Sequence, residues 1–85
     1  MTNELRKSGR HRTFKGAIIV ASGGAFTFRC VVRNLSTTGA ALELESTAAV
    51  PNQFRLDFDD RSLSKDCIVI WRSAKRLGVT FDSAR

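Results

Sequence analysis

The chain has 85 residues, of which 42% are hydrophobic and 26% charged, values typical of one globular domain with a single modest core. No apolar run is long enough to cross a bilayer, and no apolar segment of the kind found in signal peptides follows the charged N-terminus. We therefore expect a cytoplasmic protein without membrane insertion.

The net charge of +6 is unevenly distributed along the chain. Residues 1–15 carry a net charge of +4, and the remainder of the chain carries only +2. The basic residues of this first segment are Arg6, Lys7, Arg10, Arg12 and Lys15. A basic segment beside a nearly neutral body favours an anionic partner bound at one place, although a solvated tail would have the same composition. We expect a flexible basic arm over residues 1–14, because few of its side chains are apolar.

Six short segments show the apolar patterns of β-strands. They are residues 16–21, 26–33, 40–45, 54–59, 67–71 and 79–81. Ser22, Gly23 and Gly24 provide a turn between the first two, which predicts a hairpin. Strands at this spacing, without a long helical period, predict an all-β fold. The pattern favours a small antiparallel barrel or sandwich, and closure into a six-stranded antiparallel β-barrel over residues 15–82 is favoured because an open sheet this small would leave its edges and one apolar face uncovered. We expect a short tail at 83–85 and no long C-terminal helix.

The apolar faces of these alternations define the expected core. They include five aromatic side chains: Phe26, Phe28, Phe54, Phe58 and Trp71. Cys30 and Cys67 lie in apolar runs and form no Cys-x-x-Cys pair, which argues against a metal or redox site. We expect two buried free thiols, with a disulfide as the less favoured alternative.

Residues able to support catalysis are few. His11 is the only histidine, and no Cys or carboxylate stands at ligand spacing from it. Ser36 does not belong to a Gly-x-Ser-x-Gly nucleophile motif. We therefore expect no enzymatic activity, no metal site and no cofactor.

Two polar stretches stand out against this scaffold. The stretch Asn34–Gly39 combines an amide, hydroxyl groups and a glycine, a set suited to a small polar ligand, and Gly39 can adopt φ > 0. The stretch Arg6–Arg10 places two arginines four residues apart, with Ser8 and Gly9 between them. A guanidinium group binds phosphate through two parallel hydrogen bonds and also matches the edge of guanine.

Taken in this order, Arg-x-x-x-Arg followed by Asn-x-Ser-x-x-Gly resembles the PilZ domain, a bacterial six-stranded split barrel that binds the second messenger cyclic di-GMP. The likeness continues through residues 69–71 and 77–81 and covers nearly the whole chain. The resemblance implies that Arg6 and Arg10 hold phosphate and guanine. It also implies that Asn34 and Ser36 bind guanine or ribose, and that Gly39 lets the backbone approach.

Four further basic residues could add contacts to the same ligand: Lys7, Arg12, Arg33 and Arg72. Leu5 stands where many PilZ domains have another arginine, which bears on affinity and on how many ligands bind. The expected ligand is cyclic di-GMP, and no other cofactor is implied.

The resulting prediction is a cyclic di-GMP receptor whose arm changes position on binding and which signals to a downstream protein partner. One alternative is a PilZ-like module that binds only proteins. Another, less favoured, is a small basic barrel that binds nucleic acid. Against it, the aromatic residues fall on apolar faces instead of forming exposed stacking platforms. Four acidic residues would also interrupt a basic track: Glu43, Glu45, Asp57 and Asp59.

Overall fold

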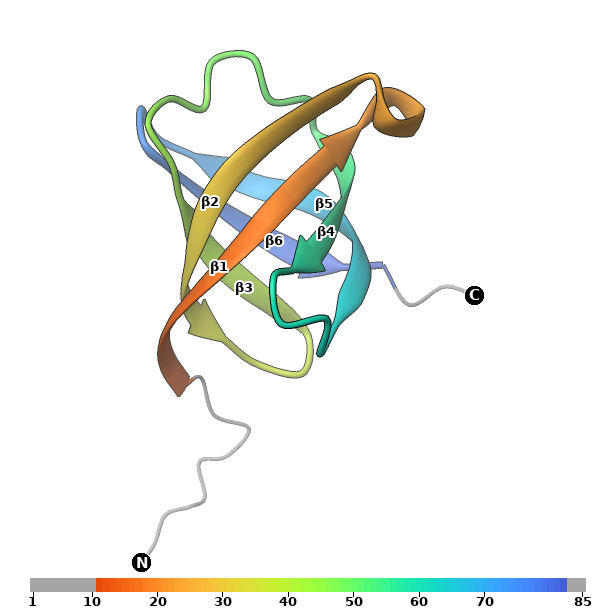
Figure 1. The fold of residues 1–85 in the computed structure, drawn as a ribbon. Helices are drawn as coiled ribbons and strands as arrows, with labels where there is room; N and C mark the ends of the chain where they lie inside the picture. Colours follow the sequence, from red (N-terminus) through yellow and green to blue (C-terminus); the bar gives the residue numbers. More distant parts are fainter. Residues whose placement is uncertain (1–10, 83–85) are drawn as a thin grey trace, which may run out of the picture.

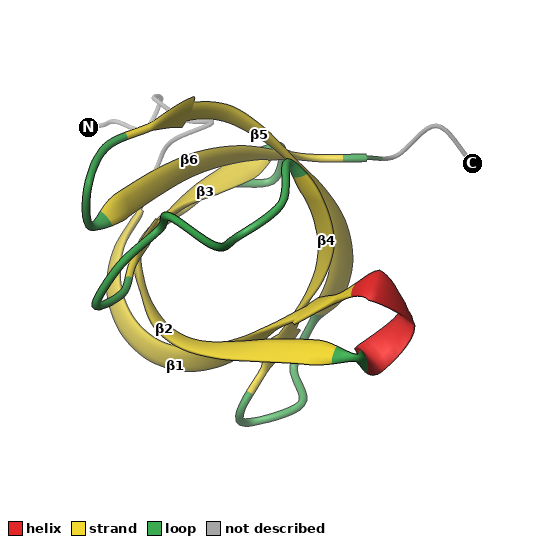
Figure 2. Ribbon diagram, turned by 90° about the horizontal axis from the view of Figure 1, so that it is seen from above, coloured by secondary structure: helices red, strands yellow, loops and turns green. Residues whose placement is uncertain are grey.

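Six antiparallel strands close into a barrel in the computed structural model, which describes residues 11–82 (Figure 1). The strands are β1 (His11–Ala21), β2 (Phe26–Leu35), β3 (Gly39–Glu43), β4 (Gln53–Phe58), β5 (Ser64–Arg72) and β6 (Arg76–Phe81). Their order around the barrel is β1-β2-β3-β6-β5-β4, and the closed ring is visible in Figure 2. The predicted six-stranded barrel is confirmed. Within the described residues, no helix is long and apolar enough to cross a membrane.

The first strand begins earlier than the sequence pattern suggested. His11 pairs with Leu35 and Arg12 with Asn34, so residues 11–14, which we assigned to the arm, belong to β1. A register shift between Arg12 and Lys15 breaks the alternation there, which hides the strand in the sequence. The rest of the predicted arm, residues 1–10, and the tail 83–85 lie outside the described residues.

The barrel interior is filled by the side chains that alternate inward along each strand. The largest fully buried ones include Ile19, Leu42, Leu56 and Leu77. Cys30 and Cys67 are buried free thiols, as predicted. Burial raises the pKa of both thiols to about 12.

The turn between β1 and β2 is formed as predicted, by the short 3-10 element η2 (Ser22–Gly24). Gly23 and Gly24 adopt φ of 67° and 101°, values that most other residues resist. Phe26, on the far side of this turn, is 60% exposed and therefore not in the core. It pairs with Ala21, the last residue of β1 and one residue beyond the last β1 residue that pairs with β4, and so lies at the end of this strand pair.

Two further register shifts change which side chains face outward. One lies in β2 between Val32 and Asn34, and the other in β5 between Val69 and Trp71. Each adds one residue to its strand, so Asn34 and Trp71 turn away from the interior that simple alternation assigns to them. The prediction that Trp71 belongs to the core is therefore wrong, and its side chain is 48% exposed.

Candidate functional site

The polar stretch Asn34–Gly39 forms the tight connection between β2 and β3. The Ser36 hydroxyl accepts hydrogen bonds from the N–H groups of Thr38 and Gly39, both at 3.2 Å. The Ser36 N–H donates to the Gly39 carbonyl at 2.9 Å. Ser36 therefore folds this connection through its own side chain, which is a common use of serine in turns.

Gly39 is required here for a reason other than the one expected. Among the glycines in residues 11–82, positive φ occurs only at Gly23 and Gly24, so Gly39 does not use the φ > 0 conformation that is open to it. A Cβ atom at position 39 would instead lie closer than 3.0 Å to the backbone carbonyl oxygen of Val79. The absence of a side chain thus lets β3 approach β6.

Strand β6 also holds the connection in place from below. The Thr38 carbonyl accepts a hydrogen bond from the Phe81 N–H at 2.8 Å and another from the Thr80 hydroxyl at 3.2 Å. These two hydrogen bonds to one carbonyl fix the position of the loop relative to β6. The loop is therefore pre-formed within the barrel structure.

One row of outward-facing residues crosses five strands beside this loop. Arg12 pairs with Asn34, Asn34 with Ala41, Ala41 with Gly78, and Gly78 with Trp71. The two central residues are small, so the middle of the row is low. A Cβ atom at Gly78 would overlap the Trp71 indole, which shows that the ring lies directly over the β6 backbone.

The low centre of this row is a hollow of about 220 Å³. The Asn34–Gly39 loop bounds it on one side, and Ile70 and Trp71 bound it on the other. Among residues 11–82, the Asn34 side-chain amide has no hydrogen-bond partner, so both its donor and its acceptor are available. The hollow thus has a hydrogen-bonding amide, that of Asn34, on one side and an aromatic surface, that of Trp71, on the other.

Trp71 is the residue of this hollow that sequence reasoning missed. The alternation of Cys67, Val69 and Trp71 placed it on the same face as two core residues. A bulge leaves no mark in such a pattern. The available signal was Gly78, since a glycine inside a strand often marks a place where another group approaches the backbone closely, here the Trp71 ring.

The additional basic residues divide between two places. Arg12 and Arg33 line a groove that also contains Asn34 and therefore adjoins the hollow. Arg72 instead donates hydrogen bonds to the Thr47 carbonyl and to Asn52 Oδ1, and so anchors the segment before β4. Arg6, Lys7 and Arg10 lie outside the described residues.

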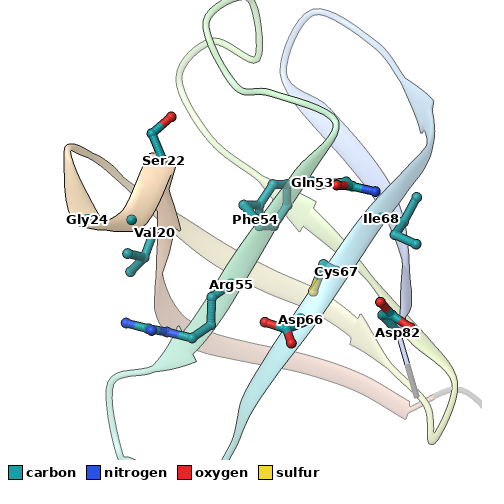
Figure 3. A pocket seen from close by; sticks show the side chains of 11 residues that line it. Val20, Ser22, Gly24, Gln53, Phe54, Arg55, Asp66, Cys67, Ile68 and Asp82 are labelled. Atoms are coloured by element: carbon teal, nitrogen blue, oxygen red, sulfur yellow. The ribbon is translucent and has the colours of Figure 1, made fainter. Parts of the chain in front are cut away.

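A second hollow, of about 410 Å³, lies over β4 and β5 (Figure 3). Its wall combines the apolar Val20, Phe54 and Ile68 with the charged Arg55 and Asp66. No residue of the Asn34–Gly39 stretch reaches it. The smaller hollow, where the polar loop, the small residues and the indole meet, is therefore the candidate site.

A closed barrel with a filled interior and a polar hollow on its outer face defines a small binding domain. The sequence profile of the PilZ domain matches residues 4–85. Because this match spans nearly the whole chain, including both polar stretches, the chain belongs to the PilZ domain family. PilZ domains are binding domains of cyclic di-GMP receptors and not catalytic domains. No curated protein matches the chain.

Proposed function

We propose that this chain is a receptor that binds cyclic di-GMP in the hollow between the Asn34–Gly39 loop and Trp71. The observation that carries the proposal is the outward row from Arg12 through Asn34 to Trp71, with Ala41 and Gly78 as its floor. One guanine base stacks on the indole, and stacking contributes about 1–3 kcal/mol per base in nucleic-acid sites. The Asn34 amide donates to and accepts from the same base or its ribose.

The basic arm completes the site. Its second arginine, Arg10, directly precedes His11. His11 pairs with Leu35, which belongs to the Asn34–Gly39 stretch. Arg6 lies five residues before His11, so an extended arm reaches back by up to about 17 Å. The 220 Å³ hollow is smaller than the roughly 300–1,000 Å³ of a typical ligand pocket, and an arm folded over it would enlarge the enclosure. We therefore assign the phosphates to Arg6 and Arg10, with added field from Lys7.

The energetics favour moderate affinity and a change in the arm. Each charge-assisted hydrogen bond contributes about 1.5–3 kcal/mol, whereas ordering a segment costs several kcal/mol. A net binding free energy near −8 kcal/mol, or a micromolar Kd, follows as an order of magnitude. The arm changes position when ligand bridges it to the barrel, and a downstream protein reads the new surface.

Calorimetric titration of the full chain with cyclic di-GMP tests the proposal. We expect saturable binding near micromolar, and a loss of about tenfold to a hundredfold for Arg10→Ala, since one charge-assisted contact disappears. Lys75→Ala, which removes the same charge from the exposed β5–β6 turn, should bind like the parent chain. Absence of heat together with unchanged chemical shifts would leave a barrel that binds only proteins.

Guanine preference provides an independent test of the Asn34 assignment. Asn34→Ala should lose less affinity than Arg10→Ala but should discriminate less between cyclic di-GMP and cyclic di-AMP, because the amide reads the base edge. Trp71 is the single tryptophan, so ligand stacking should change its fluorescence. Equal binding of both nucleotides by the parent chain would contradict a guanine-reading site.

Movement of the arm has its own readout. Amide exchange of residues 1–10 should slow on saturation with cyclic di-GMP, because the ligand bridges the arm to the barrel. Amide exchange in β4 serves as the internal control, because β4 is not adjacent to β2 or β3, the two strands that the Asn34–Gly39 loop connects. Unchanged exchange in the arm at full saturation would refute the proposed movement, even if the nucleotide binds.

Binding of nucleic acid remains the competing function to test, because Phe26 and Trp71 are exposed and the argument that all aromatics are core no longer holds. Salt separates the two. A polyanion held through many phosphates dissociates steeply as salt rises, whereas a ligand with two phosphates responds weakly. Tight, strongly salt-dependent binding of single-stranded oligonucleotides would favour the nucleic-acid function.

A further inference from the structure

A basic groove of about 670 Å³ runs beside the hollow on the outer face of the barrel. We define it by Arg12 and Phe14 of β1, Arg33 of β2 and Arg76 of β6, all of which line it. Asn34 lines both the groove and the hollow, so the two are neighbours. The two PilZ motifs include none of these four residues, of which only Arg12 and Arg33 were expected to add contacts to the nucleotide.

The groove is held in a fixed arrangement by a single carboxylate. Glu43 Oε1 lies 2.6 Å from Arg33 Nη1 and 3.6 Å from Arg76 Nη2. The Arg33 guanidinium also lies 4.9 Å from the centroid of the Phe14 ring, which is a cation–π arrangement. Arg12 has no ion pair with any described residue. Three guanidinium groups face one carboxylate here, so the groove carries an excess of two positive charges.

The face formed by β1, β2 and β4 shows what a balanced surface of this protein looks like. There each of three cations has its own carboxylate: Lys15 with Asp60 at 3.2 Å, Arg29 with Asp59 at 2.7 Å, and Arg55 with Asp57 at 3.0 Å. The groove lacks such balance. It also contains Phe14, which at 76% exposure is the most exposed large hydrophobic side chain among residues 11–82. An exposed aromatic ring among arginines is the composition of a protein-binding hot spot.

We propose that the basic groove binds an acidic segment of a partner protein. The carboxylates of the acidic segment bind the free edges of the guanidinium groups in the groove. One apolar side chain of the segment packs on the free face of the Phe14 ring. The three arginines lie on β1, β2 and β6, with β3 between the last two, so the positive charge spans a width of about 14 Å at roughly 4.8 Å between strands. An extended peptide places alternate side chains about 7 Å apart and spans this width with five residues. A cyclic dinucleotide, with both phosphates in one small ring, cannot follow it.

The groove and the nucleotide site are coupled through Asn34, a step that rests on the proposed function. Both ligands are anionic and approach the same residue from two sides. Cyclic di-GMP in the hollow therefore weakens binding of the acidic segment, and the segment weakens binding of the nucleotide by the same factor. Nucleotide binding would in this way release a partner.

The test uses a blocked seven-residue peptide of Glu and Asp with one central Phe, titrated into the nucleotide-free full chain. We expect saturable chemical-shift changes at the amides of Phe14, Arg33 and Arg76. Arg33→Gln should weaken binding about tenfold, the loss expected for one charge-assisted contact. Phe14→Ser should weaken it without any change in charge. The matched control Arg61→Gln, at an exposed position of the β4–β5 turn, should bind within about twofold of the parent chain, since only long-range charge is lost.

Three results would overturn the proposal. The shifts could fall outside the groove, or Arg61→Gln could weaken binding as much as Arg33→Gln, which would indicate non-specific attraction. Alternatively, two cyclic di-GMP molecules could bind per chain, with the second lost in Arg33→Gln, which would show that the groove is a nucleotide-binding site. Peptide binding at the groove without any nucleotide binding would refute the proposed function and leave the groove assignment intact. Unchanged peptide affinity in the nucleotide-saturated chain would refute the coupling.

Discussion

Replacing Gly78 with alanine tests whether the hollow depends on an indole ring lying across β6. The added Cβ would come closer than 3.0 Å to three atoms of the Trp71 ring, among them Nε1. The overlapped atoms belong to a side chain at the surface and not to the backbone. We therefore expect the indole to swing outward while the barrel keeps its fold.

The energetic cost follows from the area that the indole covers. Trp71 is 48% exposed, so about half of its surface is shielded. Half of the roughly 250 Å² of a large aromatic side chain, at about 25 cal/mol/Å², gives about 3 kcal/mol as an upper limit. The displaced ring recovers some contact on neighbouring side chains, and alanine is favoured over glycine in a strand by about 0.5–1 kcal/mol. We expect the free energy of unfolding to fall by about 1–2 kcal/mol.

Urea unfolding followed by circular dichroism measures this loss, and the emission of the single tryptophan reports movement of the ring. Emission should shift to longer wavelength in Gly78→Ala, because the indole gains contact with water. A double-mutant cycle supplies the control. In a Trp71→Ala background, Gly78→Ala should cost nothing or stabilise the barrel. An equal loss in both backgrounds would show that the glycine serves the backbone and not the indole.

Three other predictions follow from contacts around the site. Thr80→Val removes one of two hydrogen bonds to the Thr38 carbonyl, so amide exchange at Thr38 should accelerate, by the equivalent of about 0.5–1.5 kcal/mol. Thr80→Ser keeps the hydroxyl and should restore the slower exchange. Unchanged exchange in Thr80→Val would show that this hydrogen bond does not hold the loop. The pKa values of Cys30 and Cys67 are raised from 9.0 to about 12, so the unfolded chain loses these protons first. Unfolding free energy should therefore be independent of both thiols below about pH 9 and fall toward pH 12, by up to about 1.4 kcal/mol per pH unit per thiol. A decline equally steep in a Cys30→Ala, Cys67→Ala double variant would contradict this cause. Glu43→Gln should change stability by less than about 1 kcal/mol, since the ion pairs are partly exposed, yet should strengthen binding of the acidic peptide; weaker binding would show that Glu43 mainly positions the arginines.

The alternation of apolar side chains was sufficient to predict six strands, and the need to cover strand edges and one apolar face favoured a closed barrel over a sandwich. Phe54, Leu56 and Phe58 alternate with polar residues, and all three are buried as this pattern requires. Strand ends were less visible, because a polar residue at the barrel rim, such as Arg12, pairs with a neighbouring strand without being buried. The polar loop at Asn34–Gly39 was also predictable, since its residue types have few uses in a strand.

Three features of the site and of its predicted residues depended on tertiary geometry and could not be predicted from the pattern. Gly39 and Gly78 are needed because another strand or side chain lies within contact distance, and sequence gives no distance between β3 and β6. Arg72 binds the Thr47 carbonyl, an acceptor on a segment that the pattern left without structure. Trp71 was misplaced because one extra residue in β5 reverses the faces of all that follow.

The bulges explain how so small a barrel can carry a binding surface at all. Its interior is filled by the core, so a ligand has to bind outside, where regular strands expose only every second side chain. A bulge exposes two in succession. In β2 these are Arg33, which faces the groove, and Asn34, which faces both groove and hollow; in β5 they are Ile70 and Trp71, which together wall the hollow. Each inserted residue thus doubles the local density of outward side chains, and it does so at the two edges of the floor provided by the unbulged β3 and β6.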